Sequence, residues 1–260
     1  MSKSIPLSPS QEKIKRAQAK FEYLKSIINR YISSNPCSLR IEHYGDISHI
    51  VARREKDVPE EIGFEVVEAV GHLRSALDKL AVALVDKNGR GTSGVGFPFG
   101  AIDNGKPIII PNPRTAHIEK KFTPDQWKLI VAQRPYPGGN ETLWAINQIA
   151  NSDKHGLELV GVKPRDSSIR GLGVAGTHFG AEVLIANPPQ QETWPYDYER
   201  EKVLVFIKRG VGNLGIEAQP PSEIIFDEIA PVTGMNVLTT LNQQIRITES
   251  IVKTFKSAFF

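Results

Sequence analysis

Two short polar clusters in this chain carry residue types that could do chemistry. Arg74 and Asp78 stand four residues apart, which places them one turn apart on a helix and lets them pair. Asp153 and His155 could serve as an acid/base or ligand pair, because histidine exchanges protons near neutral pH. The candidate catalytic residues are therefore Arg74, Asp78, Asp153 and His155.

Both clusters also admit a structural interpretation. Buried charge is costly unless it is paired, so Arg74 and Asp78 could form an ion pair that fixes how helices pack. Lys154 and His155 suit the negative end of a helix dipole, and Gly156 suits the position after a helix end. The polar neighbours that could bind a ligand are Lys79, Tyr136, Asn151 and Lys154.

The other motifs in the sequence point to no metal and no cofactor. Cys37 is the only cysteine, which excludes an internal disulfide and a cysteine-based zinc site. Residues 89–94 match Gly-x-Gly-x-x-Gly, but they follow a predicted helix, whereas a dinucleotide-binding fingerprint follows a strand. The sequence contains no Walker A lysine motif and no Gly-x-Ser-x-Gly elbow. We therefore expect neither a metal nor a cofactor.

A long central helix over residues 59–86 must position the first cluster. Its apolar residues alternate steps of three and four and form a seam centred on Leu73, Leu77 and Leu80. At about 100° per residue, Arg74 and Asp78 fall on a flank of that seam. The flank also carries Val67, Ala81 and Val85, so we expect it to be half-buried. The opposite, wetter side carries Glu68, His72, Ser75 and Lys79.

Further helices are predicted on both sides of the central one. Amphipathic patterns indicate a first helix over residues 10–33 and a last one beginning near residue 234. Residues 100–135 are expected to be irregular, with short helices near 114–121 and 124–133. Asn140 can cap a helix that runs from Glu141 to about His155 and presents the second cluster.

Strand patterns occupy two parts of the chain. A hairpin with Gly45-Asp46 as its two-residue turn would pair Tyr44 with Ile47 and Glu42 with His49. That register puts His43 and His49 on opposite faces, which argues against a shared metal. Further apolar runs that suggest strands cover residues 157–162, 183–186, 203–207 and 224–226.

These elements predict an α+β fold. A helical core over about 8–156 and 234–260 would have its long central helix packed on the N- and C-terminal helices. A β-hairpin and an antiparallel β segment over about 157–232 complete a single composite domain, 1–260. The composition is 40% hydrophobic and 23% charged, and the net charge of +3 is too small to indicate a nucleic-acid partner by itself. No apolar run reaches the roughly 20 residues that span a bilayer, and the single cysteine favours a cytoplasmic protein.

The order of several short motifs resembles a family of uncharacterised bacterial proteins. The motifs are residues 72–80, HLRSALDKL, then Phe97-Pro98-Phe99, then Arg134-Pro135-Tyr136, then Asp153-Lys154-His155. The family pattern is approximately N-L-R-S-A-L-D-H-L, F-P-I, Q-P-Y and D-K-H-R, and the match covers residues 60–156.

That family usually has His where this chain has Lys79. The resulting Arg-x-x-x-x-His string is similar to the ribonuclease motif of HEPN domains, in which Arg and His cleave RNA without a metal. The resemblance therefore implies an RNA-acting helical domain of a toxin or phage-defence setting. This chain departs from the pattern at Lys79, since lysine is a poor proton shuttle at neutral pH, and at Gly156, where the family has Arg.

Three hypotheses of function follow. The leading one is a non-enzymatic binding or interaction protein, whose polar cluster is structural and whose residues 187–198 or β segment meet a partner. The alternative is a HEPN-like ribonuclease or a degenerate relative of one. The third is a small-molecule pocket between the central helix and the Asp-Lys-His turn. The expected partners are another protein or RNA, with a homodimer through amphipathic helices as a further hypothesis.

Overall fold

The computed structural model describes residues 7–44, 47–110, 115–152, 159–164, 183–184, 201–208, 222–227 and 229–260. The chain divides into two compact units. Unit 1 comprises Met1–Ser26, Glu60–Val160 and Ile225–Phe260, and unit 2 comprises Ile27–Pro59 and Gly161–Ile224. The single composite domain over residues 1–260 stays a prediction.

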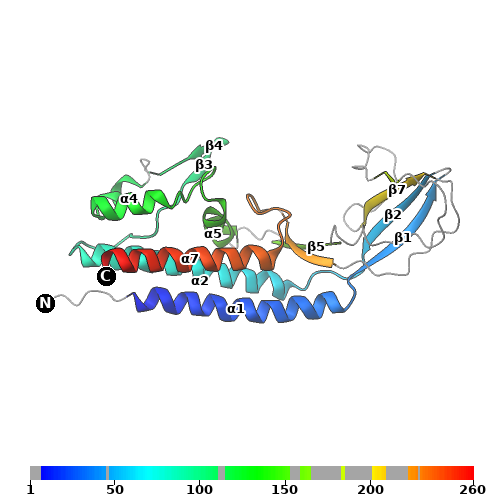
Figure 1. Ribbon diagram of the computed structural model, residues 1–260, viewed down its shortest axis with the longest axis horizontal. Helices are drawn as coiled ribbons and strands as arrows, with labels where there is room; N and C mark the ends of the chain where they lie inside the picture. The colour runs from blue at the N-terminus through cyan, green and yellow to red at the C-terminus, as the bar shows by residue number, and fades with distance from the viewer. Residues whose placement is uncertain are drawn as a thin grey trace. The chain divides into compact units, whose positions relative to one another are not determined.

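Unit 1 is built around α2, which spans Glu60–Lys87 (Figure 1). The predicted seam is its buried face, and Leu73, Leu77 and Leu80 have no exposed surface. This face lies in a core that α2 shares with α5 (Glu141–Ser152) and α7 (Val237–Phe259), which also contact each other. The long central helix is therefore confirmed.

The first helix, α1 (Ser8–Ser33), meets α2 through a row of polar contacts in unit 1. The hydrogen bonds and ion pairs join Ser10 to the Ala76 carbonyl, Lys20 to Glu65 and Glu68, and Tyr23 to Glu61. Because sequence numbers rise along α1 while they fall along α2, the two helices are antiparallel. The side of α2 that was expected to be wetter is thus partly covered by α1.

A short hairpin corrects the expectation that residues 100–135 contain only irregular chain and short helices. Strands β3 (Ala101–Asp103) and β4 (Lys106–Ile108) pair there, and Asn104 and Gly105 both have positive φ, at 48° and 73°. An Asn-Gly pair with this geometry is the preferred two-residue turn of hairpins. The two short helices are confirmed as α3 (Ala116–Glu119) and α4 (Pro124–Ala132).

Unit 2 contains a four-stranded antiparallel sheet of order β1-β2-β7-β6. Its strands are β1 (Cys37–Tyr44), β2 (Ile47–Arg54), β6 (Val183–Leu184) and β7 (Glu201–Lys208). The predicted register is confirmed, with Tyr44 opposite Ile47 and Glu42 opposite His49. The turn residues Gly45 and Asp46 lie outside the described residues.

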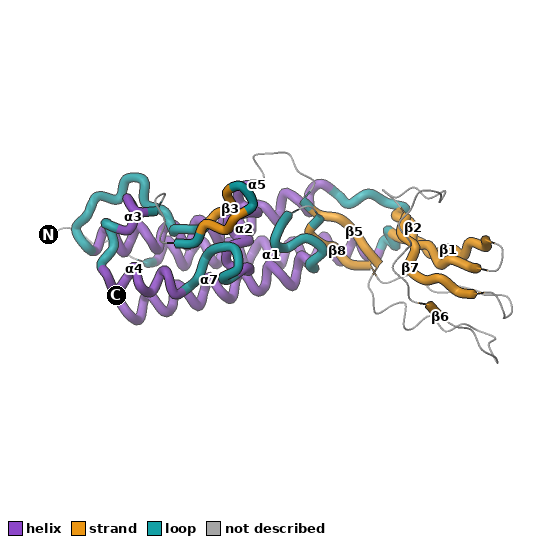
Figure 2. The backbone as a smooth tube through the Cα atoms, turned by 90° about the horizontal axis from the view of Figure 1, so that it is seen from above, coloured by secondary structure: helices purple, strands orange, loops and turns teal. Residues whose placement is uncertain are grey.

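Strands β5 (Val160–Pro164) and β8 (Ser222–Phe226) form a third, two-stranded sheet (Figure 2). The α+β class with a helical core and antiparallel hairpins is therefore confirmed. Residues 187–198 lie outside the described residues. Among the helices that the structure describes, none combines the length and apolar character needed to cross a bilayer.

The buried face of α7 carries a polar stripe, Thr240, Gln244 and Thr248, spaced one turn apart. The Thr248 hydroxyl donates to the Gln244 carbonyl at 2.8 Å. Gln244 has no exposed surface, and neither atom of its side-chain amide has a hydrogen-bond partner in the described part of the chain. Burying an amide without partners costs free energy, so this position destabilises the core.

Gln244→Met should therefore stabilise the protein, because it keeps the side-chain length and removes two unpaired polar atoms. We expect the free energy of unfolding to rise by about 1–3 kcal/mol in urea titrations followed by circular dichroism. Thr248→Val should give no comparable gain, since the Thr248 hydroxyl is hydrogen-bonded. A loss of stability in Gln244→Met would contradict the unpaired state of this amide.

His72 makes the α1–α2 contact sensitive to pH. Burial is the main reason that its pKa lies below the ordinary value, and repulsion by Lys13, Arg16 and Lys20 of α1 lowers it further, against a smaller opposing effect of Glu68. The folded protein therefore binds a proton at His72 less readily than the unfolded chain does. Stability from this group is present above about pH 6.5 and is lost as the pH falls towards the folded pKa.

His72→Gln should accordingly flatten the fall in melting temperature between pH 7.5 and pH 5.5, measured by scanning calorimetry. The matched control is His117→Gln, because His117 is an exposed histidine on α3. The control should keep the pH dependence of the parent protein. Identical pH profiles for His72→Gln and the parent would show that His72 contributes nothing to it.

Candidate functional site

Arg74 and Asp78 lie on the half-buried flank of α2 that the helical projection predicts. Their side chains are 26% and 36% exposed, so both are partly shielded from water. The Arg74 Nε atom lies 3.3 and 3.2 Å from the two carboxylate oxygens of Asp78. The expected ion pair is therefore present.

Two further groups hold the Arg74 guanidinium. Its Nη1 atom donates a hydrogen bond to the side-chain carbonyl of Asn147 on α5. Its central carbon lies 4.4 Å from the centroid of the Phe99 ring, which is a cation–π contact. We call Arg74, Asp78, Asn147 and Phe99 the Arg74 cluster. It joins α2 to α5 and to the loop that precedes β3.

Asp78 also holds this loop through its backbone. One carboxylate oxygen accepts the Phe97 N–H at 2.8 Å, so the carboxylate bonds both Arg74 and the main chain. A Cβ atom at Gly96 would come within 3.0 Å of that same oxygen, which leaves little room for a larger residue. The carboxylate thus bonds both to Arg74 and to the main chain of the loop, while part of it stays exposed.

The loop then passes through a narrow gap at Gly100. The Gly100 N–H donates to the Pro135 carbonyl at 2.8 Å, and the Gly100 carbonyl accepts the Trp144 indole N–H at 3.3 Å. A Cβ atom there would lie 2.3 Å from both the Ile108 carbonyl oxygen and the Tyr136 Cβ. Only glycine fits this crossing, which brings the Pro135-Tyr136 turn beside the cluster's loop.

The structure brings together only part of the predicted site. Lys79 is exposed and lies outside the Arg74 cluster, on the opposite side of α2, and Asn151 is exposed in the last turn of α5. Tyr136 is half-buried and packs against Gly100, where it shapes the loop. The predicted residues Asp153, Lys154 and His155 lie outside the described residues.

Two members of the cluster were missed from sequence. Asn147 could have been noticed as a polar residue beside the apolar side of α5, next to Ile146, which is fully buried. Phe99 belongs to the Phe-Pro-Phe motif, which enters the sequence analysis only as part of the family resemblance. Its ring meets the edge of Phe97 at 5.4 Å between centroids, so the motif is an aromatic cover for the guanidinium.

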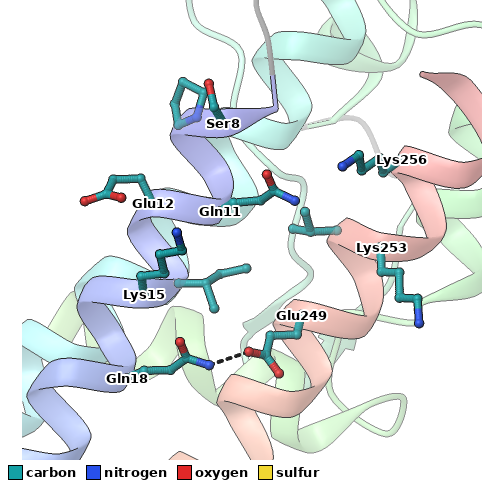
Figure 3. Close-up of a pocket in the computed structure, with 11 residues that line it drawn as sticks. Ser8, Gln11, Glu12, Lys15, Gln18, Glu249, Lys253 and Lys256 are labelled. Atoms are coloured by element: carbon teal, nitrogen blue, oxygen red, sulfur yellow. Dashed lines mark hydrogen bonds between the residues drawn. The ribbon is translucent and has the colours of Figure 1, made fainter.

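A second feature of unit 1 is a groove between α1 and α7 (Figure 3). It has a volume of about 1030 Å³ and an apolar floor that includes Ile14 and Val252. Figure 3 shows Gln11 and Gln18 reaching from α1 toward α7, and Gln18 donates to Glu249 at 2.5 Å. We call it the α1–α7 groove.

Unpaired positive charge lines this groove. Lys15, Lys253 and Lys256 are exposed along it, and none of them belongs to an ion pair among the described residues. The carboxylates of the same groove are already engaged, since Glu12 pairs with Arg16 at 3.3 Å and Glu249 accepts from Gln18. The groove therefore has an excess of positive charge, with three lysines against two carboxylates in its lining.

Neither feature has the donor set of a metal site. Among the described residues, no group of three or more His, Cys, Asp and Glu side chains could hold an ion. The chain matches no protein-family model, no curated protein and no solved structure. The resemblance to a bacterial family and to HEPN domains stays a prediction.

If the Arg74 cluster is structural, the stability of the protein should depend on the planar geometry of the guanidinium as well as on its charge. Arg74→Lys keeps the charge but loses the planar fork and the stacking on Phe99, so we expect a loss of about 1–2 kcal/mol in unfolding free energy. The partial exposure of the pair keeps this below the cost of breaking a fully buried ion pair. Urea titrations of the parent protein and of Arg74→Lys measure this loss of unfolding free energy.

The matched control for this prediction is Lys79→Ala, an exposed charge on the same helix. It should change the unfolding free energy by no more than about 0.5 kcal/mol. Equal effects of Arg74→Lys and Lys79→Ala would contradict a structural role for the cluster.

Proposed function

We propose that this protein acts by binding a partner and that the Arg74 cluster is a structural device of its helical core. The single observation that carries the proposal is that both members of the Arg74–Asp78 pair are bonded to other groups of the helical core. Asp78 holds Arg74 and the Phe97 amide, while Asn147 accepts from Nη1 of the guanidinium and Phe99 covers one of its faces. A guanidinium held in this way has its Nε and Nη1 donors engaged and one face covered by the Phe99 ring, which disfavours it as the ligand of a scissile phosphate.

The ribonuclease alternative needs a proton-transfer partner beside the arginine. A general base or acid must lie within hydrogen-bond reach of the reacting atoms. Lys79, which stands where the related motif has histidine, is exposed on the side of α2 that bears Glu68 and His72. The position of Lys79 therefore favours binding over catalysis.

The α1–α7 groove is the surface that we propose for binding. It is a concave surface with an apolar floor and polar walls, which is the general character of a recognition site. We also propose that the protein is cytoplasmic, because its only cysteine, Cys37, is a free and buried thiol.

Incubation of the purified protein with total RNA and with tRNA should leave both intact on denaturing gels. Arg74→Ala should reduce the melting temperature and change nothing on those gels. Cleavage by the parent protein that disappears in Arg74→Ala or His155→Ala, and survives in Lys128→Ala, would overturn the proposal in favour of the ribonuclease. Lys128 is the control because it is an exposed residue of α4.

A further inference from the structure

We infer that the α1–α7 groove binds a short, acidic, amphipathic helix of a partner protein. This inference rests on the proposed binding function and specifies the partner's chemistry. It starts from the shape of the surface, since α1 and α7 run in opposite directions along the two sides of the groove (Figures 1 and 3). A furrow between two long helices is the surface against which a third helix packs in helical bundles.

The length of the groove sets the length of its ligand. Lining residues on α1 extend from Ser8 to Gln18, a span of ten residue steps that rises about 15 Å along the helix axis. A bound helix of about ten residues, close to three turns, would cover this distance. Its apolar positions, spaced three and four apart, would lie over Ile14, Val252 and the methylene chains of the lysines.

Charge complementarity decides whether the bound helix is acidic or basic. Lys15, Lys253 and Lys256 lack ion-pair partners among the described residues, whereas Glu12 and Glu249 already accept from Arg16 and Gln18. Three lysines therefore face two carboxylates in the lining, and Glu12 is paired with Arg16, so a ligand that places carboxylates beside the lysines gains net attraction. Glu or Asp flanking the apolar stripe of the bound helix would supply that charge.

The same lining argues against two other occupants. A nucleic acid is uniformly negative, and its phosphates would lie beside the Glu12 and Glu249 carboxylates, while a peptide helix can place neutral or basic residues there. A second copy of this chain would bring the basic outer face of its own α1 against the lysines. That face carries Lys15, Arg16 and Lys25, and the latter two side chains are more than half exposed.

The test uses two fluorescein-labelled peptides of about 14 residues with the same composition of Leu, Glu and Ala. In the first, Leu recurs at steps of three and four, and in the second, Leu is distributed around the helix. Fluorescence anisotropy at about 0.15 M salt, where long-range surface attraction is screened, gives each dissociation constant. We expect the striped peptide to bind at least about tenfold more tightly than its isomer.

Charge reversal then locates the binding. Lys253→Glu/Lys256→Glu should weaken the striped peptide at least about tenfold, and Lys15→Glu, on the other wall, should also weaken it. Lys128→Glu on α4 is the matched control and should have no effect. Because all four lysines are exposed, circular dichroism should show each variant folded.

Several outcomes would overturn the inference. They are equal affinity for the two isomers, tighter binding of a single-stranded RNA of equal charge, absence of saturable peptide binding, or a concentration-dependent dimer that charge reversal dissolves. Each of these leaves the RNA-cleavage result untouched. Failure of the groove and failure of the non-enzymatic function are thus distinguishable.

Discussion

The partly buried positive charge of Arg74 is the constraint around which α2, α5 and the loop before β3 are arranged. A guanidinium on the flank of a core helix must be neutralised and hydrogen-bonded, or it destabilises the fold. Asp78 neutralises it from one turn away, but the ring of Phe99 and the amide of Asn147 come from a loop and from another helix. One charge thus holds three segments in a single relative position.

The loop before β3 meets specific steric and hydrogen-bond requirements beside this charge. The Phe97 amide must reach Asp78, Gly96 must leave room for the carboxylate, and Gly100 must pass between Ile108 and Tyr136. These are steric and hydrogen-bond requirements. They account for the Phe-Pro-Phe and Pro-Tyr motifs as parts of one packing unit, with no reaction required.

Local sequence periodicity predicts the main helix of the core and the β1–β2 hairpin. The seam of α2, its half-buried flank and the register of the β1–β2 hairpin all depend on residues near one another in sequence, and these expectations are confirmed. The partners Asn147 and Phe99 depend on tertiary contacts, which no spacing reveals. The β3–β4 hairpin is different, because its turn, Asn104-Gly105, is a local sequence pattern that does not depend on tertiary contacts.

The polar positions of α1 and α7 show where sequence patterns fail most. Gln244 is polar and wholly buried, whereas Lys15, Lys253 and Lys256 are polar and exposed along a groove, and amphipathic periodicity treats all four as outward-facing. The difference lies in the tertiary surroundings of each side chain. Gln244 lies in the core that α2, α5 and α7 form. The lysines form no ion pair with a carboxylate among the described residues. The lysines of the groove therefore have a stronger claim to function than Arg74, because attraction is available only to a charge that its own chain leaves unpaired.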